Sequence, residues 1–288
     1  MKVALVIGLA TGAINGLVAL GIVLVYKGAR VFNFAQAEFG TVAAFAAWGA
    51  LTKAHLPYGL AIVVGLAAAV AMGMAVERAI VRPLRARPPV TTLVATAGVA
   101  LLCIGLELAL GGARMRVFPP VPVTFNVSVM GVMLSTQRII AILVVISLGL
   151  ALAWFFSRTS LGLAVLATSQ EAIAARLAGI SIDHVSTFIW GSAALLGGIA
   201  GLLLAPINPF SPGFMTMGTL IPAFTAAVIG GLTSLPGAFV GGVLIGIAQG
   251  LGQQYLGSVI PGAPSVVVFG LLLTVLLIRP KGLFGAEV

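Results

Sequence analysis

A short polar stretch separates the first two long apolar runs of this sequence. Within "RVFNFAQAEFG", Asn33, Gln36 and Glu38 stand close together in a chain of which only 7% of the residues are charged. An ionisable side chain at the centre of a membrane helix costs about 2.5–3.5 kcal/mol, so it persists mainly where it is paired or used. Amide and carboxylate groups of this kind can hold the polar ends of a small solute, which makes the stretch the first candidate site.

The residues just before this stretch break the helix that leads into it. "YKGAR" places Gly28 ahead of a reversal of the chain, and a helix that starts late leaves backbone amides and carbonyls unpaired. Glu38 then has two interpretations. It belongs to a solute path built from these groups, or it pairs with Lys27 or Arg30, which lie at the same edge of the membrane.

Two other glutamates fall within or beside apolar runs. Glu77 is next to Arg78 and near Arg82, which predicts an ion pair at the cytoplasmic edge of the membrane. Glu107 lies one turn from the end of its run, with Arg114 and Arg116 just outside, which favours a structural pairing there.

Composition indicates the environment in which these groups work. Hydrophobic residues make up 60% of the 288 residues, which leaves too little polar surface for a water-soluble globule. The alternating pattern of a membrane β-barrel is absent, and long unbroken apolar runs take its place. We therefore predict an all-α, polytopic transmembrane helical bundle that forms one domain over residues 1–288.

Several kinds of function find no support in the sequence. The net charge of +9 is scattered over loops, which argues against nucleic-acid binding, and Cys103 is the only cysteine, which excludes an internal disulfide or a thiolate metal cage. There is no P-loop and no H-E-x-x-H motif, and we place His55 and His184 in loops without a metal partner. The sequence predicts no catalytic residues, no metal and no cofactor.

Apolar runs of roughly 20 residues predict six clear membrane spans. They cover residues 3–26, 34–51, 58–76, 91–110, 139–156 and 185–205. The first run is too long for a signal peptide and no small-residue cleavage site follows it, so it is retained as a span.

The later part of the chain is less regular. Between Leu220 and Leu256, a short run and a longer run flank "TSLPG", and the pair forms either two spans or a re-entrant hairpin. The last run, residues 261–278, ends at "RPKG". The expected total is about eight or nine crossings, with short or re-entrant segments among them.

The distribution of basic residues predicts the orientation, because cytoplasmic loops are enriched in Lys and Arg. One side carries Lys27, Arg30, Arg78, Arg82, Arg85, Arg87, Arg158, Arg176, Arg279 and Lys281, and the other carries Lys53, Arg114, Arg116 and Arg138. We assign the first side to the cytoplasm. With nine spans the N-terminus lies outside.

Glycine is abundant, with 37 residues, and it recurs at one-turn intervals. Gly237, Gly241, Gly246 and Gly250 follow one another on a single predicted helix, and small-residue pairs of this spacing let helix backbones approach closely. Tight packing of the bundle explains this pattern, and the abundance also suits helices that move past one another.

The longest cytoplasmic connection joins the fifth and sixth spans. It reads "SRTSLGLAVLATSQEAIAARLAGISIDH", with helix-forming residues that end at Gly179. The stretch that carries Glu171 and Leu177 is a short amphipathic helix that fits the groove of a partner, although an ordinary connector has the same pattern.

Five segments, in order along nearly the whole chain, resemble the integral-membrane permeases of ABC importers for branched-chain amino acids. "VFNFAQAEF" is similar to the N-F-A-H-G-E-F signature of that family, and "ERAIVRPLR" to its E-R-x-x-x-R-P-L-R loop. "TSLGLAVLATSQEAIAARLAGI" resembles its cytoplasmic coupling loop, "FTAAVIGGLTSLPGAFVGG" its late Gly-rich stretch, and "RPKGLFG" its ending.

This resemblance implies a set of partners in the lipid bilayer. The chain would pair with a second permease subunit, either a related chain or another copy of itself. Two cytoplasmic ABC ATPase subunits would supply the energy, and a periplasmic or extracellular substrate-binding protein would deliver the solute. The chain itself would be a transport subunit of the bacterial plasma (inner) membrane, without ATPase activity.

The resemblance also implies where the chain contacts its ATPases, with two departures from the family pattern. The coupling residues would be Glu171, Ala174, Ala175, Arg176 and Gly179. The acidic residue expected just before the A-A-x-x-x-G core is Ile173 here, and Gln36-Ala37 stands where the family has His-Gly.

Alternating access is the mechanism that these features favour. The resemblance implies branched-chain amino acids, or small polar solutes such as amides and urea, as substrates. The predicted pathway residues are Phe32, Asn33, Gln36, Glu38 and Asn208, the last because "APINPFSPG" breaks a helix near the outer face. The alternatives are an ion-coupled transporter or channel, in which Glu38 or Glu107 binds the ion, and a purely structural membrane subunit.

Overall fold

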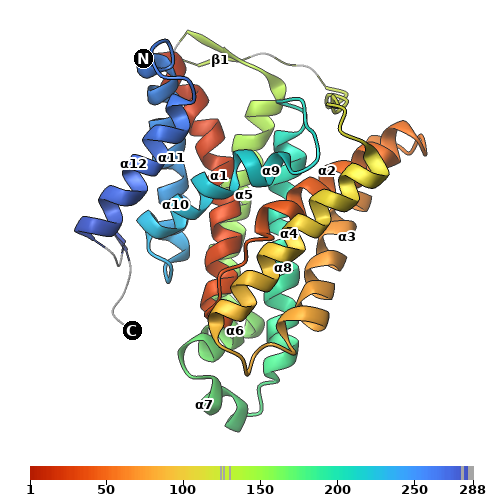
Figure 1. The fold of residues 1–288 in the computed structure, drawn as a ribbon, viewed down its shortest axis with the longest axis vertical. Helices are drawn as coiled ribbons and strands as arrows, with labels where there is room; N and C mark the ends of the chain where they lie inside the picture. The colour runs from red at the N-terminus through yellow and green to blue at the C-terminus, as the bar shows by residue number, and fades with distance from the viewer. Residues whose placement is uncertain (124, 126, 130, 280–281, 285–288) are drawn as a thin grey trace.

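The chain folds into a bundle of α-helices with one small β-hairpin at its upper end (Figure 1). The computed structural model describes residues 1–123, 125, 127–129, 131–279 and 282–284. Within these residues six helices are long and apolar enough to cross a membrane. They are α1 (Lys2–Ala29), α3 (Tyr58–Val76) with the π-helical turn η1 (Glu77–Val81), α4 (Pro89–Gly111), α5 (Thr136–Arg158), α8 (Ile182–Leu204) and α11 (Leu235–Leu256).

Shorter elements complete the described part of the chain. The apolar ones are α2 (Gln36–Thr52), α10 (Leu220–Gly230) and α12 (Ala263–Ile278), and the connecting ones are α6 (Ser160–Gln170), α7 (Ala172–Leu177) and α9 (Phe214–Gly218). The hairpin pairs β1 (Val127–Val129) with β2 (Val132–Leu134) in antiparallel register.

The predicted membrane-embedded helical bundle is confirmed, because each predicted apolar run is a helix. The stretch from Leu220 to Leu256 consists of an 11-residue helix and a 22-residue helix, joined by a turn at Gly231. At 1.5 Å per residue α10 is about 16 Å long, roughly half of the hydrocarbon core of a bilayer.

Helices α1 and α11 form the closest helix pair in the bundle. A Cβ atom built on Gly246 would lie 2.2 Å from the backbone of Gly12, so neither position has room for a larger side chain without displacing the partner helix. Asn15 donates a hydrogen bond of 2.8 Å to the Gln249 side chain in the same seam. The glycines therefore act here through close packing.

Burial distinguishes central helices from peripheral ones. Helices α1 and α8 are mostly buried, whereas α4 and α5 expose broad apolar faces that include Leu101 and Leu150. Exposed apolar side chains in such numbers are suited to contact with lipid or with another membrane chain.

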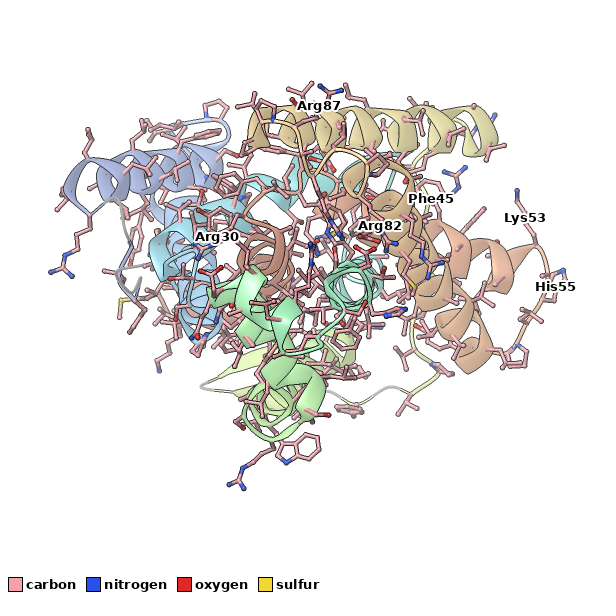
Figure 2. The ribbon with its side chains drawn as sticks, turned by 90° about the horizontal axis from the view of Figure 1, so that it is seen from below. Arg30, Phe45, Lys53, His55, Arg82 and Arg87 are labelled. Carbon is pink, nitrogen blue, oxygen red and sulfur yellow. The ribbon has the colours of Figure 1, made fainter. Side chains whose placement is uncertain are left out.

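The ends of the bundle differ in character. The N-terminus and the hairpin lie at one end, and α7 protrudes at the opposite end (Figure 1). Arg30, Arg82 and Arg87, labelled in the view from the α7 end (Figure 2), follow elements that terminate at that end. The predicted cytoplasmic side thus corresponds to the α7 end.

Candidate functional site

The polar stretch between α1 and α2 is buried and organised by its own side chains. Helix α1 ends at Arg30, whose positive φ of 54° reverses the chain. The Asn33 Oδ1 atom accepts a hydrogen bond of 3.0 Å from the amide of Ala35, and its Nδ2 atom donates to Gln36 Oε1 at 3.3 Å. These side chains replace backbone partners that the helix break removes.

Gln36 connects this stretch to two other helices. Its Nε2 atom donates a hydrogen bond of 2.8 Å to the carbonyl oxygen of Ala193 in α8. A Cβ atom at Gly21 in α1 would lie 2.2 Å from the same nitrogen, so the bare backbone of that glycine makes room for the amide. Gln36 is fully buried, and both its amide oxygen and its amide nitrogen are hydrogen-bonded, which fits a structural role at the junction of α1, α2 and α8.

Thr96 ties the same stretch to α4. Its hydroxyl oxygen accepts a hydrogen bond of 3.2 Å from the amide of Phe34, and the hydroxyl lies 2.9 Å from the carbonyl oxygen of Leu93. This contact gives α4, which otherwise packs loosely on the bundle, a specific attachment beside the break.

Phe32 belongs to an aromatic cluster that joins the break to α10. Its ring stacks on Tyr26 with centroids 4.8 Å apart and meets Phe224 edge-on at 5.3 Å. The ring of Phe34 stacks on Phe224 with centroids 6.1 Å apart. The predicted pathway residue therefore lies in an apolar aromatic wall next to the polar groups of the break.

Glu38 occupies a different environment from its polar neighbours. Its carboxylate is fully buried and faces Thr216, Glu107 and Thr41, from three elements. No donor among the described residues reaches either carboxylate oxygen of Glu38 with hydrogen-bond geometry, and the facing hydroxyls of Thr41 and Thr216 are also unpartnered. This cluster of unsatisfied polar groups at membrane depth is the most costly feature of the site.

The salt bridges of the described residues include neither the alternative pairing of Glu38 with Lys27 or Arg30 nor the predicted pairing of Glu107 with Arg114 or Arg116. Glu107 faces Glu38 and accepts a hydrogen bond of 2.9 Å from the amide of Gly213. The reason is geometric: the helix turn carries Glu38 inward, away from the edge where the cations lie.

The arginine expected to pair with Glu107 is used elsewhere. The guanidinium of Arg116 lies 4.9 Å from the ring centroids of Phe45 and Trp48 and donates to the carbonyl oxygen of Gly111. Its backbone pairs with that of Phe210. Cation–π contacts and a carbonyl thus take the place of the predicted ion pair.

Asn208, the last predicted pathway residue, is separate from the break. It is exposed on the connection between α8 and α9, and its amide donates to the carbonyl oxygen of Leu204 at 3.2 Å. Among the described residues it shares no hydrogen bond with Asn33, Gln36 or Glu38. The structure thus groups four of the five candidates around one break and leaves the fifth apart.

Glu77 lies at the α7 end and carries the predicted ion pair with Arg82, which is confirmed. The carboxylate is fully buried and accepts hydrogen bonds from Arg82 and Arg85, at 2.9 and 2.7 Å, and from the hydroxyls of Ser186 and Thr187. The hydrogen bond with Glu77 raises the pKa of Arg82, so this guanidinium remains charged.

Sequence reasoning missed the α8 half of this cluster. Asp183, in the first turn of α8, forms salt bridges with both Arg82 and Arg85. No local sequence pattern around Asp183 indicates that it contacts a loop about 100 residues earlier. The neighbouring His184, predicted to lie in a loop, is in the first turn of α8. The cluster fixes the start of α8, which follows α7 directly, to the end of α3.

The predicted coupling residues lie on and around α7. Glu171 caps the helix through a contact of 3.4 Å with the amide of Ile173, and Gly179 ends it with a φ of 83°. Ala175 is buried, whereas Ala174 and Arg176 are exposed. Ile173 and Leu177 are 72% and 85% exposed, so the helix presents apolar side chains at the tip of the molecule.

Comparisons with known proteins agree with this arrangement. Residues 4–277 match the family described as "Branched-chain amino acid transport system / permease component". The high-affinity branched-chain amino acid transport system permease protein BraD of Pseudomonas aeruginosa is 32% identical over 98% of this chain and 94% of its own length. LivH of Escherichia coli, a protein with the same description, is 30% identical over 96% and 93%.

A solved structure supports the fold. A chain of PsaBC from Streptococcus pneumoniae, in complex with Fab, superposes with a TM-score of 0.51 at 15% identity, covering 96% of this chain and 91% of that one. At this level of identity the likeness concerns the arrangement of the helices alone.

Proposed function

Because the chain belongs to the family of permease components of branched-chain amino acid transport systems, we propose that it carries branched-chain amino acids into the cytoplasm. The proposal includes amides, urea and other small polar solutes as alternative substrates. The chain is a multi-pass protein of the plasma (inner) membrane. The observation that carries this proposal is the family match over residues 4–277.

The proposed partners follow from the same membership. The permease pairs with a second permease subunit, either a related chain or another copy, and two cytoplasmic ABC ATPase subunits drive it. A periplasmic or extracellular binding protein delivers the substrate. The absence of a P-loop motif from the sequence supports a division of labour in which ATP is hydrolysed on other subunits.

The proposed topology has about nine crossings. Helices α2 and α12 have 17 and 16 residues, about 25 Å of length, which suffices when the ends of the helix lie in the headgroup region. The short helix α10 completes a crossing together with α9. Helix α12 runs away from the end that carries the N-terminus (Figure 1), which is consistent with an odd number.

The proposed pathway runs past the break between α1 and α2. Phe32 offers an aromatic surface to the side chain of the substrate, while Asn33, Gln36 and Glu38 offer polar groups to its ionised ends. The unpaired carboxylate of Glu38 supports a role in attracting the ammonium group. Asn208 lies on the outer connection, where a solute enters before it reaches the break.

The proposed coupling element is α7 with its flanking residues. Glu171, Ala174, Ala175, Arg176 and Gly179 surround a helix whose apolar tip is exposed. Closure of the ATPase subunits on ATP binding moves this helix, and the Glu77 cluster connects the movement to α3 through α8. The glycine-lined contact of α1 and α11 lets the bundle reopen on the other side.

Uptake into proteoliposomes tests this function. The complete system should accumulate leucine, isoleucine or valine only with ATP and the binding protein, and should keep doing so after the proton and sodium gradients are collapsed. Concentrative uptake by the chain alone, driven by either gradient, would establish the ion-coupled alternative, which the family membership does not favour.

A further inference from the structure

A large groove opens beside the pathway, between α1, α5, α6 and the start of α11. Its volume is about 1040 Å³. Helices α5 and α11 both pack on α1 but make little contact with each other, which leaves the space between them. None of the candidate pathway residues lines it.

The walls of the groove are apolar and open toward the membrane. Ile146 and Leu150 of α5 are 49% and 68% exposed, and Val240 of α11 is 41% exposed. Leu20 of α1 and Phe239 of α11 also line the groove. Surfaces of this kind are suited to hydrocarbon chains.

The end of the groove nearest α6 is polar and basic. Lys27 and Arg30 line it together with Ser169, Gln170 and Ser234. Among the described residues, Arg30 makes only a weak contact of 3.4 Å with the carbonyl oxygen of Ser169, and none of those that line the groove is acidic. The salt bridges of the described residues involve other arginines.

Lys27 and Arg30 lie one turn apart and have no acidic partner in the part of the chain that the structure describes. Two such cations repel one another and favour an anion between them. Basic pockets between membrane helices on the cytoplasmic side recognise anionic headgroups. We propose that the groove binds an anionic phospholipid of the cytoplasmic leaflet, with its phosphate at Lys27 and Arg30 and its acyl chains along α5 and α11.

This inference differs from a general preference for basic residues on the cytoplasmic side. Arg87 lies on the same side but not in the groove, and Figure 2 shows it well away from Arg30. A lipid in this position contacts α5 and α6, which lead into α7, as well as α1 and α11. Such a lipid would stabilise the attachment of the coupling segment to the glycine-packed helices.

The first test compares binding of phosphatidylglycerol and phosphatidylcholine to the delipidated full-length chain by native mass spectrometry. The wild type should prefer phosphatidylglycerol, and the double variant Lys27→Gln/Arg30→Gln should lose about tenfold or more of that preference. Each such cation contributes about 1 kcal/mol near an anionic surface, or roughly fivefold. The control Arg87→Gln should keep the preference.

The second test fills the space for the acyl chains. A Cβ atom at Gly149, which lines the groove, meets nothing within 4 Å, so the backbone there accepts a side chain and Gly149→Phe places a bulky ring at the groove. This variant should also bind phosphatidylglycerol at least about fivefold more weakly. Gly270→Phe on α12, equally unhindered and outside the groove, is the matched control.

The outcomes separate the possibilities. Equal binding of the two lipids by the wild type overturns the proposal and leaves the groove to a protein partner. Retained preference in the double variant overturns the headgroup assignment. Loss in the double variant with full binding by Gly149→Phe, or displacement of the lipid by glycerol phosphate alone, shows that only the phosphate is recognised and overturns the acyl-chain assignment.

Discussion

Glu77 and Glu38 are both fully buried, yet their surroundings are opposite. Glu77 accepts hydrogen bonds from two arginines and two hydroxyl groups. Glu38 has no donor for either oxygen among the described residues and faces a second carboxyl group. The first is a satisfied anchor, and the second is an unsatisfied group that stability alone does not explain.

This difference teaches how burial should be interpreted in a membrane protein. Glu77 lies at the α7 end, where the loop that follows η1 brings arginines to it. Glu38 lies inside the bundle, where the hydroxyl groups of Thr41 and Thr216 and the carboxyl group of Glu107 face it. A buried carboxylate whose partners are complete indicates a structural role, whereas an unpaired one indicates a role in transport.

Replacing the anchor should cost the most stability. Glu77→Leu leaves Arg82 and Arg85 without their buried partner, and loss of one member of a buried pair costs about 3–5 kcal/mol. Both arginines are about one-third exposed, at 34% and 32%, so we expect the lower end of that range. Denaturant unfolding of the purified full-length chain measures this change.

The exposed partner of the same cluster provides the control. The Asp183 side chain is 55% exposed, so Asp183→Asn should lower the free energy of unfolding by less than about 1 kcal/mol. Equal losses for the two variants would mean that Glu77 is not the centre of the cluster.

The satisfied amide beside Glu38 should have an intermediate effect. Gln36→Leu fills a similar volume but leaves the Ala193 carbonyl and the Asn33 amide without their partner. An unmet buried hydrogen bond costs about 1–3 kcal/mol, which the same unfolding measurement detects. Thr52→Val, which removes an exposed hydroxyl bonded to Trp48, should change little, and a similar loss there would argue against a special role of Gln36.

A change at the end of α7, which the Glu77 cluster connects to α3, should reduce transport more than stability. Gly179→Val forces a β-branched residue into a left-handed backbone conformation with φ of 83°, which costs about 1–2 kcal/mol locally. ATP hydrolysis by the assembled complex should persist while substrate uptake falls about tenfold or more.

The hairpin glycine at the other end makes a matched control for this variant. Gly131 has a φ of 81° and, like Gly179, no neighbour within 4 Å of an added Cβ atom. Gly131→Val should retain uptake. If both variants lose uptake equally, or if Gly179→Val transports normally, α7 is not the coupling element.

Neutralising the unpaired acid should cost the least stability. Glu38→Gln removes a buried carboxylate whose oxygens have no donor among the described residues, so the free energy of unfolding should stay the same or rise. Uptake should nevertheless fall about tenfold or more if the carboxylate meets the substrate. A stability loss close to that of Glu77→Leu, with normal uptake, would remove the distinction between the two glutamates.

The sequence predicted the helical elements well because apolar periodicity and length are local properties. The run at residues 58–76 coincides with α3, and the short run after Leu220 is the short helix α10. The pairing of Glu77 with Arg82 was also accessible, since the two are five residues apart on one continuous segment.

The contacts of Glu38 and Glu107 could not be predicted in the same way. Their carboxyl groups come from helices 69 residues apart in the chain, and sequence proximity pointed instead to Lys27, Arg30, Arg114 and Arg116. The direction in which each helix turn points its side chain decides the partner, and this direction depends on how α2, α4 and α9 pack.

By itself, the sequence determined the membrane environment of this protein, its helices and its family, because hydrophobicity, segment length and motif order are properties of the sequence. Only the tertiary structure decided which polar groups meet. It joined the break to α8 through Gln36, left Glu38 without a donor, and opened a basic groove between α5 and α11. These contacts depend on side-chain directions and on the spacing of helices that are distant in sequence. No local sequence pattern encodes either of them.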